Sequence, residues 1–123
     1  MINHISLTVS DFAGSVAFYT EILETIGIKP LFTIENEAIG FGADRPFFWI
    51  GASDETHPIS KNVHIAFSCS TKSEVDDWYN FAITAGAKDN GKPGFRPEYH
   101  EKYYAAFVID PDGNNIEAVY GNE

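Results

Sequence analysis

Several features are scarce in this sequence, and each scarcity narrows the class of protein. There is one cysteine, Cys69, so an internal disulfide framework is excluded and a reducing, cytoplasmic setting is expected. No run of about 18 apolar residues could span a bilayer, and the N-terminus lacks the basic start and apolar stretch of a signal peptide. We therefore expect a cytoplasmic protein without a membrane partner.

Basic residues are also few. Eight lysines and arginines stand against 18 aspartates and glutamates, which gives a net charge of −10. Such a chain repels a phosphate backbone, so we expect no nucleic-acid partner. The 123 residues, 44% of them hydrophobic, are enough for one domain with a real core.

The sequence contains an internal repeat. The segment "HISLTVSDFAGSVAFYTEILETIG", which starts at His4, aligns at an offset of 60 with "HIAFSCSTKSEVDDWYNFAITAG", which starts at His64. Each copy begins with period-two alternation, typical of a strand, and continues as a helix that ends at Gly27 or Gly86. We therefore predict two modules in one 1–123 domain, about 1–55 and about 61–121.

Strand-like segments follow each helix, so both modules are predicted to be β-α-β-β-β. In the first module these segments are "PLFTI", "AIGFG" and "PFFWIG", and in the second they are "YYAAFVID" and "NNIEAVY". The remaining strand of the second module would lie near "AKDNG". The segment "GKPGFRPEYHEK" is interpreted as a long loop that forms the functional insertion.

The two equivalent histidines suggest a metal site. A lone histidine on a strand is more often structural, but His4 and His64 both lie on the strand face opposite the apolar one. In "DPDGNNIEAVY", Glu117 points away from the apolar Ile116 and Ala118. Because a carboxylate in the middle of a closing strand is costly to bury without a partner or a cation, we predict a two-histidine, one-carboxylate site. It would suit Fe²⁺, Mn²⁺, Zn²⁺ or Ni²⁺.

These residues resemble the vicinal oxygen chelate superfamily, which includes glyoxalase I, bleomycin-resistance proteins, extradiol dioxygenases and fosfomycin-resistance thiol transferases. The segments that carry the resemblance are "NHISLTVSD", "SVAFYTEIL", "VHIAF" and, most specifically, "FVIDPDGNNIEAVY". The resemblance implies an α+β fold in which paired βαβββ modules form an open, cup-like barrel. It also implies His4, His64 and Glu117 as metal ligands, and a homodimer.

One segment departs from the glyoxalase I pattern. Glyoxalase I-like members take a further carboxylate from the last strand of the first module, but "PFFWIG" offers none. Three protein ligands are therefore expected, and methylglyoxal-glutathione isomerisation is not the expected reaction.

Further candidates surround the predicted cavity. Arg96 could hold an anionic group of the substrate, and Phe48 and Trp49 could line an aromatic pocket. His100 could move a proton, as could either Tyr103 or Tyr104, of which only one should face the cavity because they alternate on a strand. The alternative interpretation is that the lysines and Arg96 belong to a solvated loop and the aromatic residues to the core.

We thus expect a divalent-metal-dependent lyase, isomerase or dioxygenase acting on a small anionic metabolite that chelates the metal through neighbouring oxygens. Two alternatives stay open: a fosfomycin-type thiol transferase, and a non-catalytic small-molecule binding protein of the bleomycin-resistance type.

Overall fold

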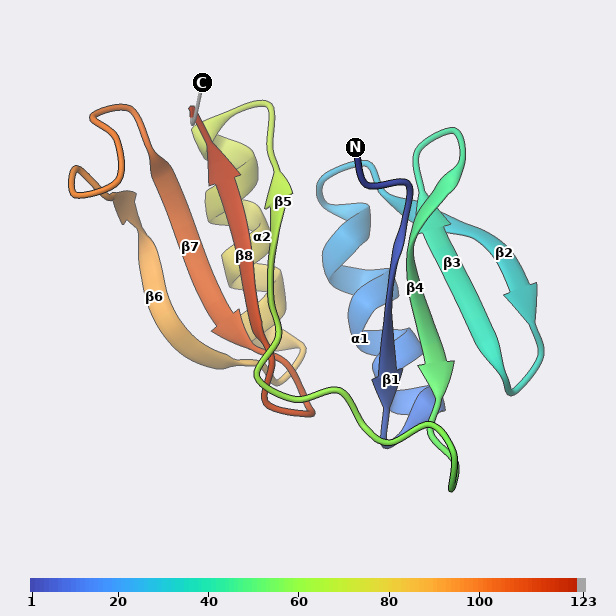
Figure 1. The fold of residues 1–123 in the computed structure, drawn as a ribbon. Helices are drawn as coiled ribbons and strands as arrows, with labels where there is room; N and C mark the ends of the chain where they lie inside the picture. Colours follow the sequence, from blue (N-terminus) through green and yellow to red (C-terminus); the bar gives the residue numbers. More distant parts are fainter. Residues whose placement is uncertain (122–123) are drawn as a thin grey trace. The chain divides into compact units, whose positions relative to one another are not determined.

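The computed structural model describes residues 1–121. The chain divides into two compact units, one comprising Met1–Lys61 and the other beginning at Asn62. Each unit is one strand, one helix and three further strands (Figure 1). The β-α-β-β-β order predicted for each half is therefore found, and the fold is α+β.

Unit 1 contains β1 (Ile5–Val9), α1 (Phe12–Glu24), β2 (Lys29–Ile34), β3 (Ala38–Gly42) and β4 (Pro46–Ala52). Its sheet has the order β1-β4-β3-β2, in which β1 and β4 are parallel and the other neighbours are antiparallel. The sheet is open, because its two edge strands β1 and β2 do not pair with each other.

Unit 2 contains β5 (His64–Ser68), α2 (Lys72–Thr84), β6 (Lys88–Phe95), β7 (Tyr104–Ile109) and β8 (Asn115–Tyr120). Its sheet repeats the arrangement of unit 1 with the order β5-β8-β7-β6, and β5 and β8 are the parallel pair. The repeat seen in the sequence is thus a repeat of topology.

Local sequence explains where the helices begin. The Asp11 side chain accepts a hydrogen bond from the Gly14 backbone N–H and caps α1. Thr71 caps α2 in the same way through the Glu74 N–H, while the Glu74 side chain accepts from the Ser70 N–H, which gives a capping box.

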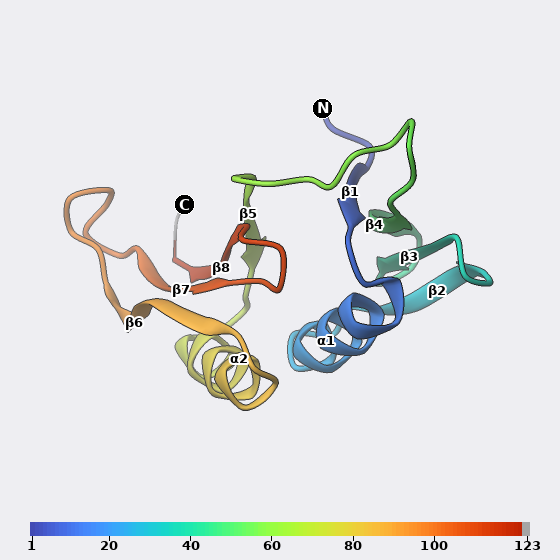
Figure 2. The same cartoon turned by 90° about the horizontal axis from the view of Figure 1, so that it is seen from below.

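In each unit the helix covers one face of its own sheet (Figure 2). In unit 1, Tyr19 of α1 packs edge-on against Phe48 of β4, with the ring centroids 5.1 Å apart, and both side chains are fully buried. In unit 2, Val75 and Trp78 of α2 are fully buried, as is Ile116 of β8. The opposite face of each sheet is therefore the face available to a site.

The prediction that "GKPGFRPEYHEK" is a loop is wrong for its first residues, which belong to strand β6. Strand β6 continues through Gly91, Pro93 and Gly94 as far as Phe95. Its register with β7 shifts twice, between Asp89 and Gly91 and again between Gly91 and Gly94. Glycine and proline accompany such bulges in strands, so residues that signal a loop in sequence here mark an irregular strand.

The segment between β7 and β8 is held by side chains. Asp110 accepts hydrogen bonds from the backbone N–H groups of Asp112 and Asn114, both at 2.9 Å. The Asn114 side chain donates to Asp110 and accepts from the Val63 N–H at 3.0 Å. Hydrogen bonds through Asn114 thus connect this Pro-Asp-Gly turn to Val63, the residue that precedes β5.

Within residues 1–121, neither helix is long and apolar enough to cross a membrane.

Candidate metal and substrate site

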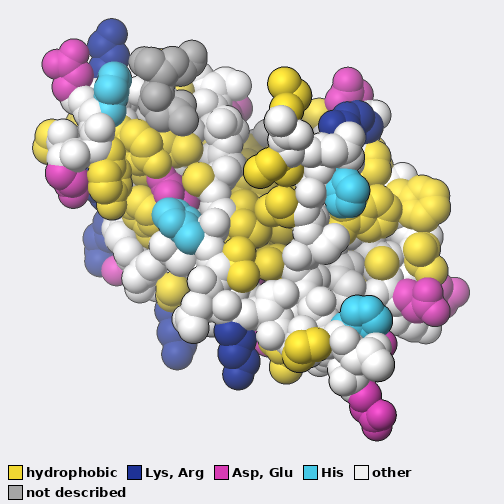
Figure 3. All heavy atoms as spheres, in the orientation of Figure 1, with side chains coloured by type: hydrophobic (Ala, Val, Ile, Leu, Met, Phe, Trp, Pro, Cys, Tyr) yellow, Lys and Arg dark blue, Asp and Glu magenta, His cyan; other side chains and the backbone are white. Residues whose placement is uncertain are grey.

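The face of the unit 2 sheet opposite α2 gathers the chemically active residues. Side chains alternate along a strand, so Tyr103, Ala105 and Phe107 point to this face, and Glu117 lies directly opposite Phe107 in the β7–β8 register. Ala105 and Phe107 form a small buried cluster with Val119. Figure 3 shows hydrophobic side chains gathered over the β7–β8 part of this face, with a histidine and an acidic side chain among them.

Glu117 and His64 are in direct contact. The His64 Nε2 atom lies 2.7 Å from Glu117 Oε1. The Glu117 side chain is only 2% exposed, whereas that of His64 is 53% exposed. Since β5 and β8 are parallel neighbours with Ala66 opposite Glu117, the two donors lie on adjacent strands of one face. Two of the three predicted ligands are thus brought together.

The second oxygen of Glu117 also has a partner. The Tyr103 hydroxyl donates a hydrogen bond to Glu117 Oε2. Burial and this hydrogen bond raise the pKa of Tyr103, so the phenol keeps its proton and acts as a donor. A carboxylate placed in an apolar cluster therefore has a partner for each of its oxygens, as its burial requires.

Tyr104 lies on the other side of the sheet. Its hydroxyl donates to Asp76 of α2 at 2.7 Å. Because neighbouring side chains alternate, only Tyr103 could share the face of Glu117. We therefore do not retain Tyr104 as a candidate catalytic residue.

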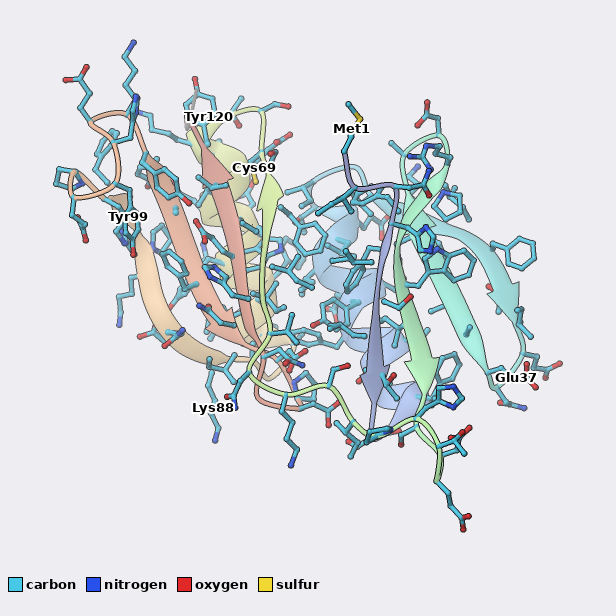
Figure 4. All side chains as sticks on the ribbon, viewed as in Figure 1. Met1, Glu37, Cys69, Lys88, Tyr99 and Tyr120 are labelled. Carbon is cyan, nitrogen blue, oxygen red and sulfur yellow. The ribbon has the colours of Figure 1, made fainter. Side chains whose placement is uncertain are left out.

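The loop after β6 contains His100 and Arg96. His100 is exposed, and its Nδ1 atom accepts a hydrogen bond from the Lys102 backbone N–H. The Arg96 guanidinium lies over the Phe107 ring, 5.3 Å from its centroid. Figure 4 labels Tyr99 in this loop and Lys88 at the other end of β6. Arg96 thus shares the sheet face of Glu117, whereas the side-chain hydrogen bond that His100 makes within residues 1–121 is to its own loop.

His4 belongs to unit 1 and comes directly before β1. It is exposed, with Nδ1 2.8 Å from the Asn3 side-chain oxygen. It lines a hollow of about 180 Å³ with residues of β1, β3 and β4, among them Ser6, Thr8 and Trp49. His4 therefore faces the side of its sheet opposite α1, as His64 does in unit 2.

The two predicted aromatic residues of β4 point in opposite directions. Phe48 is fully buried against Tyr19 and Phe41, so the structure places it in the core of unit 1 and not along the hollow. Trp49 lines the hollow, with its ring directly over Gly40, where a Cβ atom would come within 2.8 Å of it. We retain Trp49 alone as a candidate substrate contact.

The register of each sheet shows what stands in place of Glu117 in unit 1. Ser6 pairs with Trp49 across β1 and β4, and its repeat equivalent Ala66 pairs with Glu117 across β5 and β8. Trp49 is thus the topological counterpart of Glu117. A tryptophan cannot supply the carboxylate ligand that the glyoxalase I pattern places on this strand.

The donor set of unit 2 fits a divalent metal ion. A half-exposed imidazole nitrogen in contact with a buried carboxylate oxygen is a pair of ligands that Zn²⁺, Fe²⁺, Mn²⁺ and Ni²⁺ accept. No group of three or more His, Cys, Asp or Glu side chains that could hold a metal ion occurs among residues 1–121. The complete three-ligand site stays a prediction.

Sequence reasoning missed Phe107. Its ring lies next to both Arg96 and His64, with centroids of the His64 and Phe107 rings 6.1 Å apart. The period of two that places Tyr103 on this face also places Phe107 there, so the alternation along β7 could have revealed it.

Comparison with known proteins agrees with this fold. Two βαβββ units, each with an open four-stranded sheet, define an α+β class of fold. The family model of the glyoxalase/bleomycin resistance protein/dioxygenase superfamily matches residues 1–118. The chain belongs to this superfamily.

Solved structures are similar over nearly the whole chain. A glyoxalase/bleomycin resistance protein from Albidiferax ferrireducens T118 is 26% identical, covers 97% of this chain and 98% of its own, and has a TM-score of 0.85. A lactoylglutathione lyase from Agrobacterium tumefaciens is 20% identical, with coverages of 99% and 94% and a TM-score of 0.72.

A third structure is that of a mutant fosfomycin resistance protein, FosX, from Listeria monocytogenes, complexed with Mn(II) and 1S,2S-dihydroxypropylphosphonic acid. It is 20% identical, with coverages of 96% and 87% and a TM-score of 0.68. No curated protein matches the sequence significantly.

Proposed function

We propose that this protein is a divalent-metal-dependent enzyme that acts on a small molecule whose neighbouring oxygens bind the metal. The observation that carries the proposal is the 2.7 Å contact between His64 Nε2 and the buried Glu117 Oε1. Because the carboxylate is buried and the imidazole is half-exposed, a ligand can approach the pair from the side of His64. The Mn(II) in the FosX structure supports a metal in this fold.

His4 is proposed as the third ligand on the basis of the repeat. It precedes β1 as His64 begins β5, and both face the side of their sheets opposite the helix. We also propose that the protein is a homodimer. His4 would then come from the same chain or from the partner.

A bound divalent metal would act as a Lewis acid on the substrate oxygens. The chain's own residues would prepare the carboxylate for this role. The Tyr103 hydroxyl holds Glu117 Oε2, which leaves Oε1, the oxygen next to His64, as the proposed ligand atom. His100 stays a proposed proton carrier, because an imidazole can both accept and donate a proton and this one is exposed.

The register supports a three-ligand chemistry over that of glyoxalase I. Trp49 occupies the β4 position that corresponds to Glu117, so unit 1 offers no carboxylate there. Within the superfamily we therefore favour reactions that need three protein ligands, either dioxygenase chemistry or addition to a substrate held on the metal.

The metal proposal is tested by metal affinity. After purification without chelators, the wild-type protein should hold a stoichiometric divalent metal or bind added Mn²⁺, Fe²⁺, Zn²⁺ or Ni²⁺. His64→Ala, Glu117→Ala and His4→Ala should each weaken binding at least about tenfold. His57→Ala is the control, since His57 is exposed and contacts Asp54 and Thr56 in its own loop. Equal metal affinity in all five proteins would overturn the proposal.

The reaction class is tested separately. Oxygen consumption by the metal-loaded protein with catechols or 2-oxo acids would identify dioxygenase chemistry. Metal binding without turnover of any such substrate, or of thiols with epoxides, would favour the non-catalytic binding protein.

A further inference from the structure

We propose that Arg96 forms an oxyanion-binding site on the same sheet face as the His64–Glu117 pair, and that the substrate therefore carries a carboxylate, phosphonate or phosphate group. This inference deepens the proposed function and rests on it for the identity of the ligand as substrate. The binding of an anion by Arg96 can be tested by itself.

The Arg96 guanidinium is fixed by the backbone of β6. Its Nη1 atom donates to the Gly94 carbonyl at 2.9 Å and its Nη2 atom to the Lys92 carbonyl at 2.8 Å. The glycines of β6 make room for it: a Cβ atom at Gly91 would come within 3.1 Å of Nη2, and one at Gly94 within 3.2 Å of Nη1. An arginine held in this way loses little further freedom on binding a ligand.

The guanidinium also lies on an aromatic ring shared with the metal-ligand candidates. The Phe107 ring has the Arg96 Cζ atom at 5.3 Å and the His64 ring at 6.1 Å from its centroid. Phe107 is paired with Glu117 across β7 and β8. A small molecule in contact with Phe107 could therefore reach the guanidinium at one end and the His64–Glu117 pair at the other.

Among the residues that the structure describes, 1–121, no acidic side chain neutralises the charge of Arg96. Although the chain has 18 acidic and eight basic residues, no carboxylate within residues 1–121 forms an ion pair with Arg96. Both hydrogen bonds that its side chain makes within this described part of the chain go to neutral carbonyls. A guanidinium has five N–H donors, so these two bonds leave three for a ligand. A partly buried arginine with free donors and no counter-ion is suited to capture an oxyanion.

The experiment measures anion binding to the full chain as purified, without added metal. Acetate and methylphosphonate are titrated while the Arg96 Nε–H and Phe107 backbone N–H signals are followed by NMR. These two probes separate a preference for carboxylate from one for phosphonate. Saturable shifts of both signals with at least one probe are expected.

Three variants identify the residue responsible. Arg96→Gln should weaken binding at least about tenfold, which corresponds to about 1.4 kcal/mol. Arg96→Lys, which keeps the charge but loses the planar fork, should bind with intermediate affinity. Arg45→Gln is the matched control: it removes the same charge from exposed Arg45 in unit 1 and should leave the affinity within about twofold of wild type. Thermal unfolding confirms that each variant is folded.

The proposal is overturned if neither probe moves the two signals, or if Arg96→Gln and Arg45→Gln bind as the wild type does. Its failure is distinct from failure of the metal proposal. Metal binding that depends on Glu117, without anion binding that depends on Arg96, overturns only the proposal of an oxyanion site. Anion binding that depends on Arg96, without metal binding that depends on Glu117, overturns the metal proposal and retains the oxyanion site.

Discussion

At the scale of single residues, Glu117 is the side chain on which the site depends. It is almost fully buried beside Phe107 and Val119, where an unpartnered carboxylate would be strongly unfavourable. Tyr103 and His64 each contact one of its oxygens. These two contacts offset the cost of burying Glu117 and also fix the position of its carboxylate, the candidate ligand.

Tyr103→Phe tests this arrangement. The variant keeps the ring but leaves Glu117 Oε2 without its donor, so we expect a loss of about 1–3 kcal/mol in the free energy of unfolding. Denaturant unfolding provides the measurement. Tyr99→Phe is the control, because Tyr99 is 64% exposed and its ring packs against Tyr103 without a hydrogen bond to Glu117. Equal stability of the two variants would contradict the role given to the Tyr103 hydroxyl.

Cys69 gives a pH-dependent prediction. Burial, together with the nearby charge of Glu74, raises the pKa of this thiol from 9.0 to about 12. Native protein near pH 8 should therefore alkylate at least about a hundredfold more slowly than the unfolded chain, because the thiolate is the reactive form.

The same shift affects stability in alkaline solution. Between pH 9 and about 12 the unfolded chain releases the thiol proton while the folded chain retains it, so this contribution to stability is lost as the pH rises through that window. The free energy of unfolding of the wild type should fall more steeply there than that of Cys69→Ser. Parallel pH profiles of the two proteins would contradict the assignment.

At the scale of elements, the turn between β7 and β8 has a structural role. Asn114 is fully buried, contacts Asp110 and accepts the Val63 N–H, so it joins the turn to the start of β5. Asn114→Ala removes a fully buried side chain and leaves the part-buried Val63 N–H without its acceptor, so it should cost about 1–3 kcal/mol in the free energy of unfolding.

Thermal or denaturant unfolding measures this effect. Asn90→Ala serves as the control, because exposed Asn90 makes one 3.2 Å hydrogen bond to Asn115 and should change stability by less than about 0.5 kcal/mol. If Asn114→Ala is no less stable than Asn90→Ala, the turn does not hold β5.

At the scale of the whole molecule, the metal proposal requires donors from both units. Hydrogen exchange of backbone amides, measured with and without added Mn²⁺ or Zn²⁺, should show slower exchange in β1 as well as in β5 and β8. Binding stabilises the elements that supply ligands, by about 2.7 kcal/mol at a metal concentration of 100 times Kd. Slower exchange in β5 and β8 alone would retain His64 and Glu117 and exclude His4.

Much of the architecture could be predicted from the sequence. The repeat at an offset of 60 between His4 and His64 and the alternation around Glu117 can be seen in the sequence itself, because each is a pattern of neighbouring residues. The same signals were misleading in β6, where Gly91 and Gly94 mark bulges in a strand and not the start of a loop. Whether glycine ends or bends a strand depends on the neighbouring strand, which a sequence segment does not contain.

The sequence by itself determined the repeat, the fold class and the residue types that could bind a metal, because periodicity and side-chain chemistry depend only on the order and type of the residues. Only the tertiary structure decided which of these residues share a face. Strand pairing brings His64, Tyr103 and Glu117 together in unit 2, turns Tyr104 towards α2 and Phe48 into the core, and sets Arg96 on Phe107. These outcomes depend on register and packing between residues far apart in the chain, and no local pattern contains that information.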